Sequence, residues 1–415
     1  MALWRSTVIV SAMTMLSRVL GLVRDIVLLN VFGAGKDFDT FVVAFRIPNF
    51  FRRLFAEGAF SQAFIPVLTE YKTGRTHAEV QILISRVFGC LMTVMTALTF
   101  IAMVAAPAVL YIYAPGFHAD PEKFDLAVSM FRLTIPYLLF MSLTAFASSI
   151  LNSYGSFASP AFSPVLLNVA MIAGAWWLTP YMAEPIMALG WAVIAAGVLQ
   201  LAIQIPELWH KKLLIPPKVD FKHEGVDRIM KLMLPALFGV SVTQINLLLN
   251  TIWASFMQDG SVSWLYSAER MTELPLGLIG VAIGTVILPA LSTRHAEQDM
   301  SKFRGMMDWA AKVIVLVGVP ASIALFMLST PIIQALFQRG QFTLEDTQMT
   351  ALALQCMSAG VISFMLIKVF APGFYAQQDT KTPVRVGLMA VAANAILNVV
   401  FIGFFKLIDW QAEHM

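Results

Sequence analysis

Six basic and four acidic side chains fall within residues 17–57 of a chain whose composition is otherwise that of a lipid-embedded protein. The five arginines among them are Arg18, Arg24, Arg46, Arg52 and Arg53. An ionised side chain at the middle of a bilayer costs about 2.5–3.5 kcal/mol, so several in one region need a polar, wet cavity around them. The excess of positive charge therefore predicts a cationic pocket for an anionic ligand.

The choice of arginine narrows the chemistry of that ligand. A guanidinium group stays charged and can grip two phosphate oxygens at once, whereas a buried lysine can lose its proton. Three or four arginines from different helices suit a diphosphate better than a carboxylate or an inorganic ion. The acids Asp25, Asp39 and Glu57 would hold the arginines in place and neutralise them while no ligand is bound.

The first predicted helix carries its polar residues on one face. Ser17 and Arg24 lie two turns apart on one line, and Arg18 and Asp25 lie beside that line with the same separation. Adjacent residues project about 100° apart, so we expect Arg24 and Asp25 to pair poorly within the helix. The alternative is that Asp25 merely neutralises Arg18 or Arg24.

The second predicted helix repeats this pattern over a longer span. Residues spaced three or four apart along one face are Asp39, Val42, Arg46, Asn49 and Arg53, and Glu57 continues this mostly polar line one turn beyond. Arg52 reaches a neighbouring face, and Pro48 is expected to bend or break the helix where the charges gather. A structural alternative pairs Arg53 with Glu57, which leaves Arg52 and Arg18 unexplained.

A third group lies in SVSWLYSAERMTELP, residues 261–275, and comprises Ser263, Glu269, Arg270 and Glu273. Glu269 and Glu273 should share a face, with Arg270 pointing away from it toward the pocket. The alternative is an ordinary ion pair at a helix end. Pro275 is expected to bend or break this helix as well.

The composition predicts an all-α integral membrane protein. Hydrophobic residues make up 58% of the 415 residues and charged residues 13%, whereas soluble domains are nearer half apolar and a quarter charged. Apolar segments long enough to span a bilayer number about eleven. Cys90 and Cys356 both fall in apolar runs and are interpreted as core thiols.

Two repeated helical lobes around a central cavity are predicted. The most polar connection separates an N-terminal lobe of six helices, 1–208, from an incomplete C-terminal lobe, 226–415, through a cytoplasmic linker, 209–225. An offset of 223 residues pairs FIPVL, 64–68, with ILPAL, 287–291. Five helices after the linker are one fewer than a matching repeat needs, which favours a truncated chain. Parallel repeats suit alternating-access transporters with a site near the midplane.

The distribution of Lys and Arg in the connections predicts a cytoplasmic N-terminus. Fourteen fall on one side: Arg5, Lys72, Arg75, Lys211, Lys212, Lys218, Lys222, Arg228, Lys231, Arg294, Lys302, Arg304, Lys381 and Arg385. Four fall on the other: Lys36, Lys123, Arg339 and Lys406.

The sequence lacks the motifs of an enzyme. Its six histidines form no cluster, and no nucleotide-binding glycine loop or nucleophile–His–acid arrangement is apparent. We predict no catalytic residues, metal site or cofactor, and no nucleic-acid partner. Coupling of transport to the membrane potential or to a cation stays open.

Several blocks of sequence resemble one family closely. They are SAMTMLSRVLGLVRD (11–25), FRRLFAEGAFSQAFIPVLTEY (51–71), GSVSWLYSAERMTELPLGLIGVAIGTVILPALS (260–292), LFQRGQFT (336–343) and KVFAPGFYAQQDTKTPVRV (368–386). The chain is thereby similar, nearly end to end, to the MurJ (MviN) lipid II flippases of the multidrug/oligosaccharidyl-lipid/polysaccharide exporter superfamily.

The resemblance implies a transporter of lipid II, an undecaprenyl-diphosphate carrying a disaccharide-pentapeptide. Such proteins move it from the inner to the outer leaflet of the bacterial inner membrane for peptidoglycan synthesis. The family's required arginines fall on Arg18, Arg24, Arg52 and Arg270, with Asp39 as an acidic companion. The resemblance also implies a monomer, with cell-wall synthesis proteins as possible partners.

The chain departs from the family pattern in two respects. The family has fourteen helices, the last two forming a groove for the lipid tail, whereas this sequence ends after about eleven. Some relatives have a sodium site in the second lobe. Here the corresponding helices offer Asn246, Asn250, Asn394 and Asn398 but no central carboxylate, so that site is not carried over.

Two rival transporter classes also fit the sequence. An exporter of another polyprenyl-linked glycan would bind the same diphosphate. An ion-coupled drug exporter of the same superfamily should have a carboxylate-rich, aromatic cavity, which the arginine excess disfavours.

Overall fold

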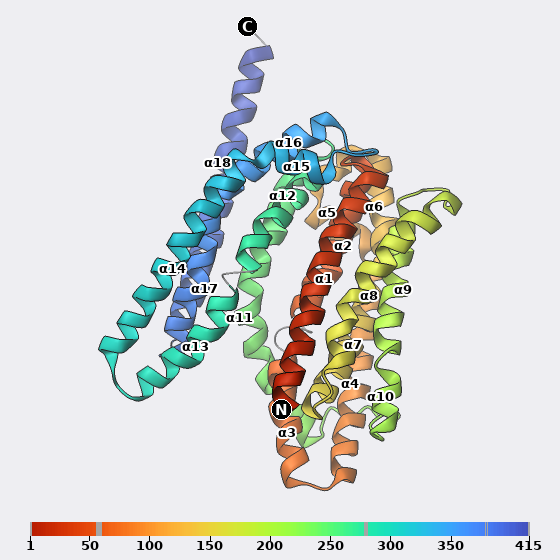
Figure 1. Ribbon diagram of the computed structural model, residues 1–415. Coiled ribbons are helices and arrows are strands. Elements are labelled where there is room, and N and C mark those ends of the chain that lie inside the picture. The colour runs from red at the N-terminus through yellow and green to blue at the C-terminus, as the bar shows by residue number, and fades with distance from the viewer. Residues whose placement is uncertain (1, 55–59, 278–280, 378, 380, 414–415) are drawn as a thin grey trace. The chain divides into compact units, whose positions relative to one another are not determined.

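The computed structural model describes residues 2–54, 60–277, 281–377, 379 and 381–413. Within these ranges it describes side chains except at 2–9, 52–54, 234–244, 281–282, 284–286 and 405–413. The described residues form helices and connections without a strand, which confirms the all-α prediction (Figure 1).

The helices of the first part of the chain are α1 (Ala2–Phe32), α2 (Lys36–Leu54), α3 (Phe60–Gly74), α4 (His77–Val104), α5 (Ala106–Tyr113), α6 (Pro121–Thr134), α7 (Tyr137–Ser153), α8 (Ala158–Ala173), α9 (Met187–Ala202), α10 (Ile205–His210) and α11 (Glu224–Ser255). Those of the second part are α12 (Ser261–Pro275), α13 (Val281–Ala296), α14 (Met300–Met327), α15 (Ser329–Phe337), α16 (Leu344–Ser358), α17 (Val361–Ala376) and α18 (Lys381–Glu413).

The chain folds into two compact units. Unit 1 comprises residues 1–244 and 255–259, and unit 2 comprises residues 245–254 and 260–415. Helix α11 therefore contributes to both units, and its last residue, Ser255, with the segment that follows it to Asp259, belongs to unit 1. The predicted lobe boundaries at 208 and 226 stay a prediction.

Helix pairs that are distant in sequence build unit 1. Helix α1 packs on α8, α2 on α6, and α7 lies against α3, α4 and α9 (Figure 1). The core between α3, α4 and α7 contains Phe64, Leu68, Leu83 and Phe146. The rings of Phe64 and Phe146 are tilted by 41°, with their centroids 5.2 Å apart. Aromatic contacts at this distance add to the stability that burial provides.

The linker of unit 1 is an ordered strap, residues 211–223, that runs along α4. The backbone N–H of Lys218 donates to the Ser85 carbonyl at 3.1 Å, and the Ser85 hydroxyl donates to the Pro216 carbonyl at 2.7 Å. Leu213 is buried in the core of unit 1. Gly89 lets the strap approach, because a Cβ there would lie 2.4 Å from the Lys218 carbonyl.

Unit 2 packs α12 on α16, and α13 and α14 on α17. Asp346 joins two of these helices. Its carboxylate accepts from Thr343 to cap α16, and it also accepts from the Trp264 indole N–H at 2.8 Å. Both residues of that inter-helix bond are buried, so the bond fixes the start of α12 against α16.

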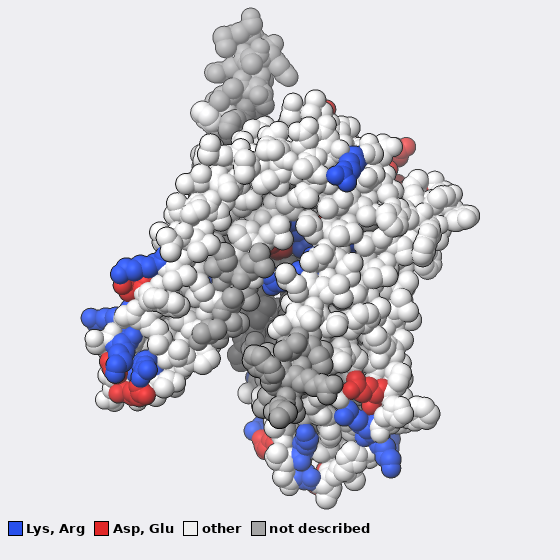
Figure 2. All heavy atoms as spheres, in the orientation of Figure 1, with Lys and Arg blue, Asp and Glu red and all other residues white. Residues whose placement is uncertain are grey.

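Long apolar helices account for the membrane character of the chain. Among the described residues, six are long and apolar enough to cross a bilayer, or seven if α16 and α17, which meet at a bend of 42°, form one span. The predicted total of about eleven stays a prediction. Figure 2 shows most of the charged atoms gathered toward helix ends, with largely uncharged surface and a few charged atoms between them. This is the pattern expected of membrane-spanning bundles.

Three local expectations have definite outcomes. Helix α12 continues past Pro275 as a π-helical turn at residues 276–277, and α2 continues through Pro48 to Leu54, so neither proline breaks its helix, and whether either bends it stays a prediction. Cys90 is buried, but Cys356 is exposed, so its interpretation as a core thiol is wrong. A helix in a bilayer can turn apolar residues outward to lipid, and an apolar run alone therefore does not indicate burial within the protein.

Candidate functional site

Arg24 lies in the interior of unit 1, where α1 packs on α8. It is 4% exposed, and its guanidinium group is held from two directions. Nε and Nη2 donate to one carboxylate oxygen of Asp25, at 2.9 and 2.6 Å. Nη1 donates to the side-chain oxygen of Asn168 on α8 at 3.1 Å. Hydrogen bonds between charged groups of this kind are among the stronger ones in proteins.

The expectation that Arg24 and Asp25 would pair poorly is wrong. Their Cβ atoms diverge along the helix, but the arginine side chain is long enough to fold back onto its neighbour. The pair is buried on both sides, with side chains 5% and 3% exposed. Burial favours this contact because each charge, removed from water, gains an opposite charge within hydrogen-bond distance.

The other polar residues of α1 are less enclosed. Arg18 is exposed to solvent or lipid, and it makes no ion pair with a side chain that the structure describes. Ser17 is half-buried, and its carbonyl accepts a hydrogen bond of 3.0 Å from the Asn168 amide. Arg18 and Arg24 therefore lie on one helix but in different surroundings.

Asp39, on the first turn of α2, forms part of a buried ion cluster. Lys123 on α6 donates to Asp39 at 3.1 Å and to Asp259 at 2.6 Å, and its ammonium lies 4.2 Å from the centre of the Phe117 ring. Asp39 and Lys123 are 1% and 4% exposed. The positive charge of Lys123 lies between two acids, and it stabilises the buried Asp39 carboxylate.

A surface ion cluster lies at the same helix ends. Lys36 pairs with Asp120 at 2.8 Å and with Glu122 at 2.9 Å. Hydrogen bonds to these acids raise the pKa of Lys36, and the bond from Lys36 lowers the pKa of Asp120. All three groups remain accessible to water, so this cluster contributes much less to stability than the buried one.

The rest of the predicted α2 set is only partly described. Arg46 and Asn49 are half-buried, and each interacts with another group of the chain. Arg52 and Arg53 lie within α2, but their side chains are outside the described residues, as is Glu57 altogether. The alternative pairing of Arg53 with Glu57 therefore stays a prediction.

Helix α12 of unit 2 carries the remaining predicted residues. Arg270 donates to Glu273 at 3.0 Å, and its guanidinium lies 5.5 Å from the centre of the Tyr266 ring. The expectation that Arg270 points away from Glu273 is wrong, because residues three apart are neighbours on a helix surface. Glu269 is half-buried and Ser263 is fully buried.

Four asparagines of unit 2 form a chain of hydrogen bonds between α11 and α18. The amide of Asn394 donates to Asn246 at 2.7 Å and to Asn250 at 3.0 Å, and Asn398 donates to Asn394 at 3.3 Å. In a membrane, side-chain amides join helices in this way because lipid offers them no partner. The amides satisfy one another here, so this cluster has an evident structural role.

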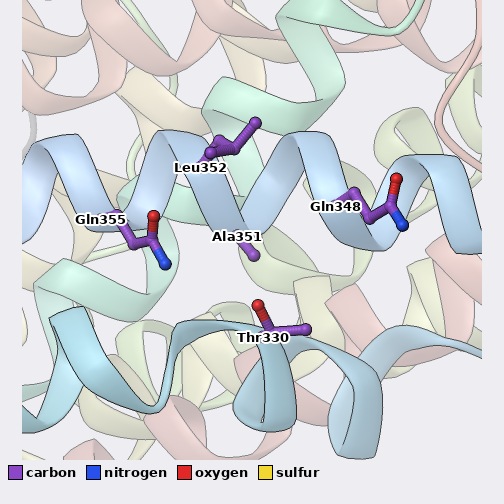
Figure 3. Close-up of a pocket in the computed structure, with 5 residues that line it drawn as sticks. All are labelled: Thr330, Gln348, Ala351, Leu352 and Gln355. Carbon is purple, nitrogen blue, oxygen red and sulfur yellow. The ribbon is translucent and has the colours of Figure 1, made fainter.

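The pocket between α15 and α16 differs from the predicted cationic site. It is lined by uncharged side chains, with Thr330 on α15 facing α16 and Gln348, Ala351, Leu352 and Gln355 on α16 (Figure 3). It offers no group that would neutralise an anion. The charged residues of α1 and α2 in unit 1, and those of α12 in unit 2, therefore remain the candidate functional residues.

Sequence reasoning missed two residues of this site. Asn168 is a single amide within an apolar run, FSPVLLNVAMIA, and that isolation is the signal that could have identified it. Lys123 lies in the polar segment PEKFD and was assigned to a connection, although it is buried in α6. Nothing in its immediate sequence predicts the acids from α2 and 255–259 that surround it.

The model of the lipid II flippase MurJ family matches residues 28–409 of the chain. The chain belongs to this family. A probable lipid II flippase MurJ from Vibrio cholerae serotype O1 is 47% identical over 410 residues, which cover 97% of this chain and 78% of that protein. The lipid II flippase MurJ of Burkholderia cenocepacia is 43% identical, with coverage of 97% and 79%.

Solved structures agree with this assignment. A lipid II flippase MurJ in an inward closed conformation superposes with a TM-score of 0.82 at 28% identity, covering 95% of this chain and 81% of that one. An inward-facing multidrug resistance MATE transporter of the MOP superfamily gives 0.65 at 12% identity, with coverage of 96% and 98%, which shows a shared fold alone.

Membership in the MurJ family confirms the resemblance that the sequence blocks indicated. The protein is a lipid II flippase of peptidoglycan synthesis, and it is a multi-pass transporter of the inner membrane rather than an enzyme. Its substrate is therefore a lipid with an anionic headgroup. The arginines of α1, α2 and α12 are the groups to consider for its recognition.

Proposed function

We propose that Arg18, Arg24, Arg52 and Arg270 bind the diphosphate of lipid II while the protein alternates between inward-open and outward-open states. The lipid-linked disaccharide-pentapeptide then moves from the inner to the outer leaflet. The other polar residues of the candidate site would line the same cavity: Ser17, Asp25, Asp39, Arg46, Asn49, Arg53, Glu57, Ser263, Glu269 and Glu273.

The surroundings of Arg24 support this proposal most directly. A fully buried arginine in a membrane helix is costly unless other groups neutralise and orient it. Asp25 supplies the opposite charge and Asn168 a neutral hydrogen bond. An arginine held in this way can exchange its carboxylate partner for a phosphate that offers more oxygens.

Arg270 supports it from unit 2. Its partner Glu273 has a side chain that is 46% exposed, so the Arg270–Glu273 pair is weaker than the buried Arg24–Asp25 pair. A diphosphate could displace Glu273 at little cost. The meeting of Arg18 and Arg24 with Arg270 around one ligand is part of the proposal, as are a cytoplasmic N-terminus and a monomeric state.

The test is transbilayer movement of labelled lipid II in vesicles that contain the purified protein. Arg18→Ala, Arg24→Ala and Arg270→Ala should each reduce the rate at least about tenfold, because each removes a charge-assisted hydrogen bond to phosphate. Arg52→Lys should also be impaired, because an ammonium group cannot make the paired hydrogen bonds of a guanidinium group.

Arg132→Ala is the matched control. Arg132 is an exposed arginine of α6 that donates to the Met103 carbonyl at 3.2 Å, and it lies outside the candidate site. Its removal should leave the rate close to that of the parent protein. Parent-like rates for all three alanine variants of the site would show that these arginines do not bind the diphosphate.

A further inference from the structure

We propose that Asn168 is a positioning residue that holds the Arg24 guanidinium in place for the diphosphate. This inference rests on the proposed role of Arg24 and adds a residue to it. Asn168 is on α8, far from the arginine-rich stretch in sequence, and it lies within an apolar run. Its side chain links α8 to the charged residues of α1, where Met171 of α8 also contacts Arg24 Nη1 at 3.9 Å.

Both ends of the Asn168 amide are engaged. The oxygen accepts from Arg24 Nη1 at 3.1 Å, and the nitrogen donates to the Ser17 carbonyl at 3.0 Å. Asn168 is 5% exposed, so neither bond competes with bulk water. The donor to Ser17 fixes which way the amide faces, and this leaves the oxygen directed at Arg24.

Asn168 and Asp25 hold opposite edges of the guanidinium plane. Asp25 accepts from Nε and Nη2, whereas Asn168 accepts from Nη1. An arginine side chain has many rotamers, and fixing them before the ligand arrives lowers the entropy lost on binding. A phosphate that displaced Asp25 would meet a guanidinium that Asn168 still holds.

The neutrality of Asn168 also matters. Arg24 and Asp25 together carry no net charge, and an acid at position 168 would make the group negative and repel a phosphate. An amide orients Arg24 without removing its positive charge. The residue type therefore suits a positioning role toward an anion.

A purely structural role makes a different prediction. If Asn168 only joins α8 to α1 through the Ser17 carbonyl, its removal should lower stability and leave lipid II affinity unaffected. Gln200 on α9 provides the matched control. It is 2% exposed, accepts from the Tyr137 hydroxyl at 3.1 Å and donates to the Ser163 carbonyl at 3.0 Å. It thus joins helices of the same unit without touching Arg24.

The experiment measures lipid II affinity and thermal unfolding of the full chain in detergent, for Asn168→Ala, Gln200→Ala, Arg24→Ala and the Asn168→Ala/Arg24→Ala double variant. Both amide variants should unfold at lower temperature. Asn168→Ala should weaken binding roughly tenfold, as expected for loss of one hydrogen bond to a charged group. Gln200→Ala should bind within about twofold of the parent, and the double variant should bind no worse than Arg24→Ala.

The outcomes separate this inference from the proposed function. If Arg24→Ala binds weakly while Asn168→Ala binds like Gln200→Ala, the positioning role is wrong and the role of Arg24 stands. A further loss in the double variant equal to that of Asn168→Ala alone also overturns it, because Asn168 would then act independently of Arg24. If Arg24→Ala binds lipid II as the parent does, both proposals fall.

Discussion

Lys123 shows that burial decides what a charged residue does. In the sequence it looks like one of the few cations of an outer connection, but its ammonium lies inside unit 1 between Asp39 and Asp259. Asp39 is almost completely enclosed, and Lys123 provides a counterion for its carboxylate. The Lys36 cluster has the same composition at the surface, where water solvates each group.

Replacing Lys123 with methionine keeps the bulk of the side chain and removes its charge. We expect Lys123→Met to lower the free energy of unfolding by about 3 kcal/mol, because it removes the positive charge that lies 3.1 Å from the buried Asp39 carboxylate. The double variant Lys123→Met/Asp39→Asn should recover part of the lost free energy of unfolding. Reversible unfolding in mixed detergent micelles measures both changes.

Lys36→Met is the control for this prediction, since Lys36 pairs with two acids at the protein surface. Its unfolding midpoint should stay close to that of the parent protein. Equal stabilities for Lys123→Met and the parent would mean that Asp39 does not depend on Lys123.

The residue types of the candidate site were predictable from sequence, but their partners were not. Arginines in an apolar chain predict a polar cavity, because any bilayer imposes a free-energy cost on a charged side chain placed within it. Which group neutralises each arginine depends on helix packing. Arg24 bonds to Asn168 only because α1 packs on α8, and the α12 pair of Arg270 with Glu273 depends on which side-chain rotamers the unit selects.

At the level of elements, helix positions followed from apolar runs, whereas the behaviour of their ends did not. The family block DTKTPV illustrates this point. Asp379 accepts from the backbone N–H groups of Lys381 and Thr382, both at 3.0 Å, so the motif caps the start of α18. The linker likewise read as a polar connection, but it forms a strap that packs along α4.

Gly89 tests whether close packing of the strap contributes to stability. A methyl group there would lie 2.4 Å from the carbonyl carbon and oxygen of Lys218, and neither backbone atom can move without shifting the strap. Gly89→Ala should therefore lower the free energy of unfolding by about 1–3 kcal/mol, despite the better helix propensity of alanine. Thermal unfolding of the purified protein provides the measurement.

Gly305→Ala is the opposite case. Gly305 is exposed within α14, and a Cβ there would meet no atom within 4 Å. Alanine should raise stability slightly at this position, because it restricts the unfolded chain without a clash. If Gly89→Ala also raised the stability, the strap would tolerate the extra methyl group and the prediction for Gly89 would be wrong.

At the scale of the whole molecule, the side of the membrane on which each helix end lies decides the direction of transport. The strap residue Lys222 precedes α11, and the strap contacts the first turns of α4 through Arg86 and Asp220, 3.6 Å apart. Glu122 begins α6, beyond the far end of α4. A helix of 28 residues spans about 42 Å, so these two positions belong to opposite faces of unit 1.

The bias of Lys and Arg toward the face of the strap predicts that this face is cytoplasmic. The N-terminus lies at the same end of unit 1, which carries α3 and α10, and is therefore predicted to be cytoplasmic as well (Figure 1).

Lys222→Cys and Glu122→Cys, each in a Cys90→Ser/Cys356→Ser background, report on the two faces. Both positions are exposed, and the Glu122 side chain is 90% accessible. A membrane-impermeant maleimide should label Glu122→Cys in right-side-out vesicles, and Lys222→Cys only in inside-out vesicles. The reverse labelling pattern would contradict this orientation and place the Lys36 cluster on the cytoplasmic side. Lipid II entering from the cytoplasmic leaflet would then meet the Lys36 cluster first.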